Sequence, residues 1–480
     1  MGRPDLSTAA RRWLTLAVFA VALAVRLLFW QATPDRAWPH SVLYKGDAVV
    51  WTDYATSLAR GADFEAGLPL RPPGNAYLLR WLGVDGRQDV GGAKLAWCVL
   101  GAAVAAIFYR AALAAFGSAV ALAVGLWSAL STGLLMLSTS LNNENPYLVL
   151  VGLILLAAPR LAAQPSPGRL LAWGGLHGLA CLVRVEHLLF ALAAFGWLAV
   201  VRWREGPAKL GMQRLAKLAV PSAIGFCVVL APWHLSAWET IGEFNRVEAE
   251  LPAAVEAAQR RIEEATEGIR WTSEALAARD RLPAFARRAA GNFVAATVLI
   301  RGGREVGAGE LTILEEAFGS RPRALPSHPF VALYGPLNFY LANRDGAPAG
   351  FDPDGLDRRP SLAGGIDRYP QALLAGLPPR DLNFAYPPHV EVVTDGYRLG
   401  WRWIRAHPSE FLRLAVARLD VAWRGAALGW TGRGLPWGLA GERRAVDLTV
   451  PGGTGFALWR WLLAALCLGG IWCGRREPLL

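Results

Sequence analysis

Long apolar runs separated by polar stretches dominate the chain. The first run, Trp13 to Trp30, contains 18 residues, of which only Arg26 is charged. This length is close to the lower limit of about 17–25 residues for a helix that crosses a bilayer. Seven further apolar runs cover residues 93–109, 117–137, 146–159, 170–183, 187–201, 216–235 and 455–473. The pattern therefore predicts a polytopic, mainly α-helical membrane protein with about eight spans.

Two polar segments, 31–92 and 236–454, separate these runs. Within the second, residues 248–282 are rich in Ala, Glu and Arg and predict a solvated helix. Residues 320–390 are dense in Pro and Gly and predict irregular structure. Residues 396–425 alternate apolar and basic side chains at helical spacing, which favours a helix along the membrane surface. We therefore expect this segment to form a mixed domain, part α-helical and part irregular.

The composition agrees with membrane insertion and fixes the expected domains. Hydrophobic residues make up 54% of the chain and charged residues 18%, against about 25% charged in soluble domains. The first run exceeds the apolar region of a signal peptide, about 7–15 residues, so we expect an anchor. The expected parts are a transmembrane bundle at 1–235 that includes the loop 31–92, an outer-face domain at 236–454, and a last span with a short cytoplasmic tail at 455–480.

The charge distribution predicts the orientation. The net charge is +11, and the short segments 1–12, 110–116, 160–169, 202–217 and 474–480 together contain 13 Lys and Arg residues but three acidic residues. Basic loops stay in the cytoplasm, so both polar segments are expected outside, on the outer face of the cytoplasmic membrane. We therefore interpret the basic excess as a topology signal and expect no nucleic-acid partner. The partners expected from topology alone are membrane lipids.

The stretch YKGDAVVWTDYATSLARG, residues 44–61, places acidic residues directly after the first apolar run. From Asp47, the positions +4, +8, +11 and +14 form one helical stripe that includes Trp51 and ends at Gly61, a typical C-cap residue. Asp47 at the helix start is also a good N-cap, and this structural role stays open. Asp53 lies about 240° around the helix from Asp47, so these two carboxylates do not form a pair.

Several motifs along the chain resemble one enzyme superfamily. Besides the stripe from Asp47, they are RPPGNAYLLRWLG (71–83), NNENPY (142–147), GLACLVRVEHLL (178–189), APWHLSAWETIGEF (231–244), GPLNFYLANRDGAPAGF (335–351) and WIRAHPSEFLRLAVARLDVAW (403–423). Together they resemble the GT-C membrane glycosyltransferases, in the bacterial branch of the protein O-mannosyltransferase and aminoarabinose-transferase superfamily. The chain departs from the family at Asp47-Ala48, where relatives usually have Asp-Glu.

The resemblance implies a GT-C-like helical bundle and a transfer reaction. Such enzymes move a sugar from a polyprenyl-phosphate carrier to a glycan, lipid or protein acceptor at the outer face. A carboxylate takes the proton of the acceptor hydroxyl, and cations stabilise the leaving phosphate. The implied catalytic residues are Asp47 and Glu144. The implied phosphate-binding residues are Lys45, Arg71 and Arg184, and the supporting residues are Trp51, Tyr77, Glu186 and Asn343.

Several of these residues have a second interpretation. Glu144 is a second acid, a metal ligand or a cap for the following helix, since Pro146 stands in its first turn. Arg184 binds phosphate or forms an ion pair with Glu186 or Glu144 that orients helices. For Arg26, inside the first run, we favour a structural role.

No metal site is predicted, although a divalent metal is possible because some relatives use one. His177, His187 and His234 each stand alone at the end of an apolar run and are expected at the membrane interface. The five cysteines lie in or beside apolar runs and show no metal or redox spacing.

Two other functions compete with glycosyl transfer from a polyprenyl-phosphate donor. The first is an O-antigen ligase or polymerase that uses a diphosphate-linked donor. The second is a transporter or lipid-binding membrane protein without catalysis. A transporter would show inverted repeats and spans broken near the membrane midplane. In this chain the acidic residues fall in outer loops and a large outer segment is present, which favours the enzyme.

Overall fold

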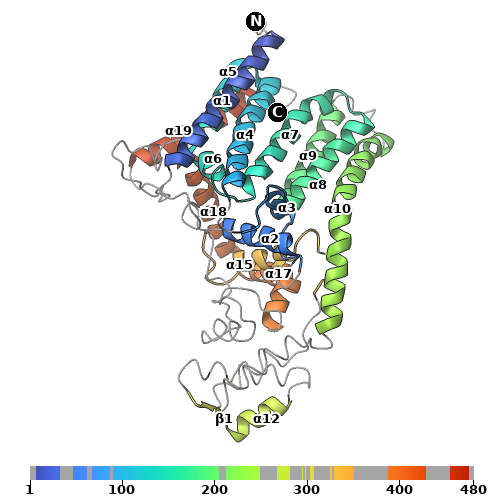
Figure 1. Ribbon diagram of the computed structural model, residues 1–480, viewed down its shortest axis with the longest axis vertical. Coiled ribbons are helices and arrows are strands. Elements are labelled where there is room, and N and C mark those ends of the chain that lie inside the picture. Colours follow the sequence, from blue (N-terminus) through green and yellow to red (C-terminus); the bar gives the residue numbers. More distant parts are fainter. Residues whose placement is uncertain are drawn as a thin grey trace. The chain divides into compact units, whose positions relative to one another are not determined.

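The computed structural model describes most of the chain (Figure 1). The described residues are 7–32, 47–61, 68–86, 90–204, 212–248, 268–281, 295, 298, 303–307, 325–326, 329–350, 387–428 and 454–474. The chain divides into two compact units. Unit 1 comprises Met1–Gly67, Pro72–Leu235 and Asp420–Leu480, and unit 2 comprises Leu68–Arg71 and Ser236–Leu419.

Helices make up nearly all of the described structure. Those that lie wholly in unit 1 are α1 (Thr8–Ala32), α2 (Ala48–Arg60), α3 (Gly74–Trp81), α4 (Gly91–Phe116), α5 (Ser118–Leu130), α6 (Thr132–Leu137), α7 (Glu144–Ala163), α8 (Pro167–Val183), α9 (His187–Arg204) and α19 (Thr454–Gly474). Unit 2 contains α12 (Ser273–Arg281), α15 (Tyr334–Ala342) and α17 (Pro387–Ala406). The long α10 (Met212–Glu248) and α18 (Pro408–Leu428) contribute to both units.

The predicted fold class is confirmed. Among the described residues, five helices are long and apolar enough to cross a membrane: Thr8–Gln31, Gly91–Phe116, Glu144–Ala163, His187–Arg204 and Ala216–Gly242. Helices cover the eight predicted apolar runs except at Gly117 and Ser131, and five of the eight runs meet these criteria among the described residues. Ser118–Leu130 and Ala457–Gly469 are shorter apolar helices. The described sheet consists of β1 (Arg270–Trp271) and β2 (Glu305–Val306), which pair in parallel. The chain is therefore a mainly α polytopic membrane protein.

The apolar run 117–137 breaks into α5 and α6 at Ser131, which has an extended backbone. The break leaves carbonyl groups at the end of α5 without helical partners. The buried Arg26 of α1 satisfies two of them, with Nη1 3.2 Å from the Ala129 oxygen and Nη2 3.1 Å from the Ser128 oxygen. Its Nε donates to Ser138 Oγ at 2.9 Å. These bonds support the structural role expected for Arg26.

Small residues allow the helices of unit 1 to approach closely. Helices α1, α5 and α7 all pack against α4, and α1, α4 and α7 run side by side in Figure 1. Helices α8 and α10 approach through Gly174 and Gly225. A Cβ atom at Gly174 would lie 1.9 Å from the Ser222 carbonyl oxygen, and one at Gly225 would lie 2.0 Å from the Leu171 carbonyl oxygen. Small residues at helix crossings are typical of membrane bundles.

Unit 2 is built around α15 and α17, which pack against each other. The short segment Leu68–Arg71 joins this unit through its backbone, since the N–H of Leu333 donates to Pro69 O at 2.9 Å. The buried core combines residues from distant parts of the sequence: Leu68, Leu70, Ile241, Leu325, Leu333, Leu337, Val392 and Val393. Arg418 of α18 donates a hydrogen bond to the Ala342 carbonyl at the end of α15, where a cation is favourable.

The details expected for the outer segment are partly corrected. The stretch 396–425 forms two helices, because α17 ends at Ala406 and α18 begins at Pro408. Proline is well tolerated at the first helical position but interrupts a helix that continues through it. Within the stretch expected to be irregular, residues 334–342 form α15. Residues 351–386, and 249–267 of the expected solvated helix, lie outside the described residues.

Candidate functional site

Asp47 occupies the N-cap position of α2, but its side chain does not cap the helix. Its backbone is already helical, with φ −64° and ψ −12°, and its carboxylate accepts no capping hydrogen bond. The Asp47 carbonyl accepts from the N–H of Trp51 at 2.8 Å. The side chain is exposed. The carboxylate therefore makes no capping hydrogen bond at the start of α2.

The predicted stripe of α2 is its buried face. Trp51 and Ala55 are buried against α3 and the start of α4, where Leu79 and Trp97 join the same core. The predicted C-cap is confirmed, because Gly61 is left-handed, with φ 59°, and its N–H donates to Ser57 O. Trp51 thus anchors α2 in the bundle.

Three other candidates lie within α2 or close to it in the sequence, and the structure describes two of them. Tyr77 of α3 is 54% exposed. Lys45 lies outside the described residues, and Asp53 is partly buried on α2.

Glu144 and Arg184 form an ion pair between two helix ends. Glu144 is the first residue of α7, and Arg184 directly follows α8. Arg184 Nη1 lies 2.8 Å from Glu144 Oε1, and Arg184 Nε lies 3.8 Å from Glu186 Oε2. Asn143 Nδ2 donates to the Val183 carbonyl at 3.0 Å and ties the same two helix ends together. The structure therefore brings together three candidates that the sequence singled out.

The ion pair is only partly buried, which limits its value for stability. The exposed fractions of the side chains are 31% for Arg184 and 34% for Glu144. Pairs near the surface contribute about 0–1 kcal/mol to folding. Glu144 also gains from the positive end of α7. Its second oxygen, Oε2, is shielded from solvent and has no hydrogen-bond partner among the described residues. Glu144 thus holds Arg184 with one oxygen, while the other is buried without a partner among the described residues.

A chain of contacts extends from Arg184 into the bundle. The Arg184 guanidinium lies over the ring of Tyr147, 5.8 Å from its centroid. The Tyr147 hydroxyl shares a hydrogen bond of 3.0 Å with His187 Nδ1. His187 Nε2 in turn lies 2.8 Å from His177 Nδ1. This arrangement connects α7, α8 and α9.

The expectation for His177 and His187 was wrong. Both side chains are buried, with exposed fractions of 0% and 1%, and they contact each other instead of standing alone at the interface. Trp173 meets His177 edge to face at 4.5 Å between ring centroids, and Phe195 also packs on it. The sequence offers one signal for this contact. The short connection between the apolar runs 170–183 and 187–201 reverses the chain and so brings the second half of one helix beside the start of the next.

Two further candidates lie in unit 2. The guanidinium of Arg71 stacks over the ring of Tyr334, 4.6 Å from its centroid, and Nη2 lies 3.4 Å from the Tyr334 hydroxyl. Asn343 is the C-cap residue of α15 and is buried. Its Nδ2 donates to the Phe339 carbonyl at 2.8 Å. Asn343 therefore terminates the helix, and Arg71 is fixed against an aromatic ring.

The described residues do not fit a divalent-metal site. No group of three or more His, Cys, Asp or Glu side chains in this part of the chain is arranged to hold a metal ion. Glu144 is paired with Arg184, and the two buried histidines point at each other. We therefore derive no step through a metal.

One region of the chain matches a known protein family. Residues 71–233 match the dolichyl-phosphate-mannose-protein mannosyltransferase family. This family is of the GT-C type, so the resemblance inferred from the motifs is confirmed over these residues. No curated protein and no solved structure shows a significant match. The match and the five candidate spans indicate a membrane glycosyltransferase.

Proposed function

We propose that this chain transfers a sugar from a polyprenyl-phosphate donor to a hydroxyl group of a glycan, lipid or protein acceptor. The observation that carries the proposal is that the family match at residues 71–233 includes the Glu144–Arg184 ion pair. The pair combines a cation suited to phosphate with a carboxylate that holds this cation in place. The reaction takes place at the outer face of the cytoplasmic membrane, in line with the basic segments assigned to the cytoplasm.

The reaction requires a base and a stabilised leaving group. The oxygen of the acceptor hydroxyl attacks the anomeric carbon, and the bond from that carbon to the phosphate oxygen breaks. Asp47 takes the proton of the hydroxyl, and the polyprenyl phosphate leaves with the additional negative charge. The exposed Asp47 carboxylate makes no capping bond in α2, which supports this role because it remains free to accept a proton.

The cationic candidates stabilise the phosphate. Arg184 has a planar guanidinium that binds two phosphate oxygens at once, a geometry that a lysine lacks. Glu144 and the ring of Tyr147 hold this guanidinium in place. Lys45 and Arg71 are the further phosphate-binding candidates, and Glu186 supports Arg184 at 3.8 Å.

Three candidates remain, namely Trp51, Asn343 and Tyr77. Trp51 anchors α2 in the core and thereby fixes the helix that begins at Asp47. Asn343 terminates α15. Tyr77 is exposed on α3 and is available to contact substrate. We propose Trp51 and Asn343 as positioning residues, and Tyr77 as a residue that contacts substrate.

The proposal is tested by consumption of a defined donor. The purified full chain, reconstituted in liposomes, is incubated with a panel of polyprenyl-phosphate sugars, and the release of polyprenyl phosphate is measured. We expect release from at least one donor of this class and none from the matching polyprenyl-diphosphate sugars. Consumption of diphosphate-linked donors alone would instead show a ligase or polymerase. The absence of any release, from a folded protein given membrane acceptors, would contradict the proposal.

A further inference from the structure

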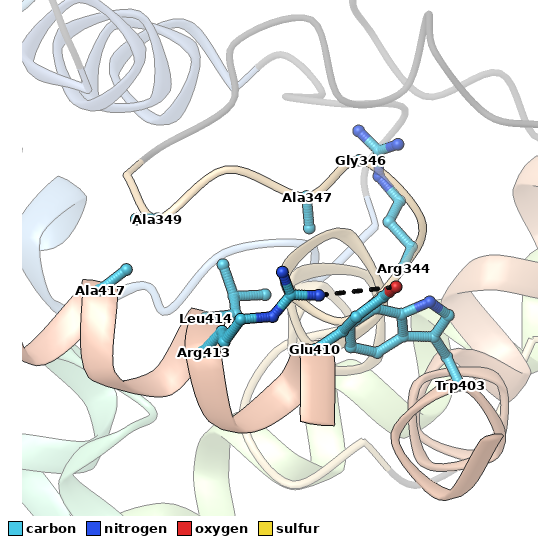
Figure 2. Close-up of a pocket in the computed structure, with 9 residues that line it drawn as sticks. All are labelled: Arg344, Gly346, Ala347, Ala349, Trp403, Glu410, Arg413, Leu414 and Ala417. Carbon is cyan, nitrogen blue, oxygen red and sulfur yellow. Dashed lines mark ion pairs between the residues drawn. The ribbon is translucent and has the colours of Figure 1, made fainter. Parts of the chain in front are cut away.

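Unit 2 contains a pocket that the proposed catalytic residues do not use. It lies between the segment that follows α15 and the helices α17 and α18, and its volume is about 350 Å³ (Figure 2). Trp403, Glu410 and Arg413 line it, together with Arg344 and small apolar residues. Small-molecule sites in proteins have volumes of about 300–1,000 Å³. The pocket is therefore large enough for a ligand of this class.

The sides of this pocket are formed by one face of α18, the last turn of α17 and the segment after α15. Glu410, Arg413 and Ala417 stand at helical spacing on α18, so they share one face. Trp403 is in the last turn of α17, and its Nε1 donates to Asp345 Oδ1 at 2.6 Å. This bond ties the segment after α15 to α17. The break between α17 and α18 turns the two helices so that both contribute side chains to the pocket.

The pocket has hydrogen-bond donors and an acceptor close to an aromatic ring. The guanidinium of Arg413 and the carboxylate of Glu410 point toward each other, 3.9 Å apart, close to Trp403 (Figure 2). Arg344 is buried and supplies a second guanidinium. Guanidinium groups donate hydrogen bonds and a carboxylate accepts them, so together they match a hydroxyl group, which does both. An indole ring offers a flat apolar surface with a large contact area.

Electrostatics distinguish between possible ligands. Arg413 and Glu410 partly balance each other's charge, so a ligand gains little from carrying a net charge beside this pair. A neutral ligand with many hydroxyl groups can hydrogen-bond to both side chains, and its C–H groups pack on the indole. Ala347 and Ala417 line the pocket with small side chains.

We propose that this pocket binds a neutral saccharide. This saccharide is part of the acceptor, an assignment that rests on the function proposed above. Binding itself needs neither a donor nor turnover. The pocket adds a recognition site in unit 2 for one class of acceptor, namely glycans.

Saturation-transfer NMR on the full chain in nanodiscs tests this proposal. The probes are methyl pyranosides and linear oligosaccharides at millimolar concentration, with inorganic phosphate as a competitor. We expect saturation transfer to at least one saccharide, unaffected by phosphate. The transfer should be lost in Trp403→Ala and in Ala417→Phe, which fills the pocket without removing a polar group. Trp401→Ala is the matched control, because Trp401 is on the same helix, is 52% exposed and does not line the pocket.

Three outcomes would overturn the proposal. These are no transfer to any saccharide, equal transfer in the wild type and in a folded Ala417→Phe variant, and displacement of the saccharide by phosphate. Because the measurement contains no donor, a chain that binds saccharide but consumes no polyprenyl-phosphate sugar would refute the proposed function alone. A chain that consumes donor but binds no saccharide would refute the pocket alone.

Discussion

His177 Nδ1 lies 2.8 Å from His187 Nε2, so an imidazole within α8 and one at the start of α9 form one buried pair. The pair continues through the hydroxyl of Tyr147 to the ring that supports Arg184. A hydrogen-bonded chain in an apolar environment is stable only when its members are paired. The ring that contacts Arg184 is therefore held through its hydroxyl by a buried histidine pair.

Removing the hydroxyl of Tyr147 should weaken this chain. Tyr147→Phe keeps the ring beneath Arg184 but leaves His187 Nδ1 buried without its partner, which costs about 1–3 kcal/mol. We expect a lower apparent melting temperature in detergent. Tyr77→Phe is the control, because Tyr77 is largely exposed. Equal melting temperatures for the two variants would show that the bond contributes nothing.

The ion pair should matter more for activity than for stability. Neutralising Arg184 with Arg184→Gln should cost at most about 1 kcal/mol of folding free energy, because the pair is partly exposed. The rate of transfer should fall by about 10²–10³, as is typical when one group that stabilises developing charge is removed. Steady-state kinetics and thermal unfolding on the same preparation separate the two effects. A large loss of stability at a normal rate would support the helix-orienting interpretation instead.

The crossing of α8 and α10 should not tolerate a methyl group at Gly174. In Gly174→Ala the new Cβ would lie 1.9 Å from the carbonyl oxygen of Ser222, so the helices must separate. Overpacking of this kind costs about 1–3 kcal/mol. Gly175→Ala is a matched control on the neighbouring residue, where the nearest atom is 3.6 Å away. Size-exclusion profiles and melting temperatures of both variants measure the difference. Similar profiles would contradict the close crossing.

The orientation can be tested with single cysteines in a background without native cysteine. Ser273 is exposed on α12 in the segment expected outside, and Ser118 is exposed beside the segment 110–116 expected in the cytoplasm. Ser273→Cys should react with an impermeant maleimide in intact cells. Ser118→Cys should react only after lysis. The reverse pattern would invert the topology.

Local features of the fold could be predicted from the sequence, whereas tertiary ones could not. The apolar runs predict the helices because burial in lipid requires consecutive apolar residues, and the stripe from Trp51 to Gly61 predicts the buried face and the end of α2. At the break at Ser131, the freed carbonyl groups accept hydrogen bonds from Arg26, more than a hundred positions away. No local pattern encodes such a contact.

The candidate site shows the same division. The motifs single out Glu144, Arg184 and Glu186 individually, and the ion pair is one of several alternatives that they allow. The pairing of His177 with His187 is not predicted, because isolated histidines at span ends have no periodic signal. The break at Pro408 could have been predicted, since a proline in the middle of a helical pattern is a known interruption.

The central claim is that Asp47 is the base that accepts the proton of the acceptor hydroxyl. Asp47→Asn keeps the size of the side chain, and α2 loses no capping bond, so folding should be unchanged. The decisive measurement is the rate of sugar transfer from a polyprenyl-phosphate donor by Asp47→Asn and by Asp53→Asn at matched expression. Asp47→Asn should lower the rate by about 10²–10⁴, the usual contribution of a general base. Asp53→Asn, about 240° away on the same helix, should cost far less. Near-normal turnover in Asp47→Asn, with turnover abolished in Asp53→Asn, would contradict the account.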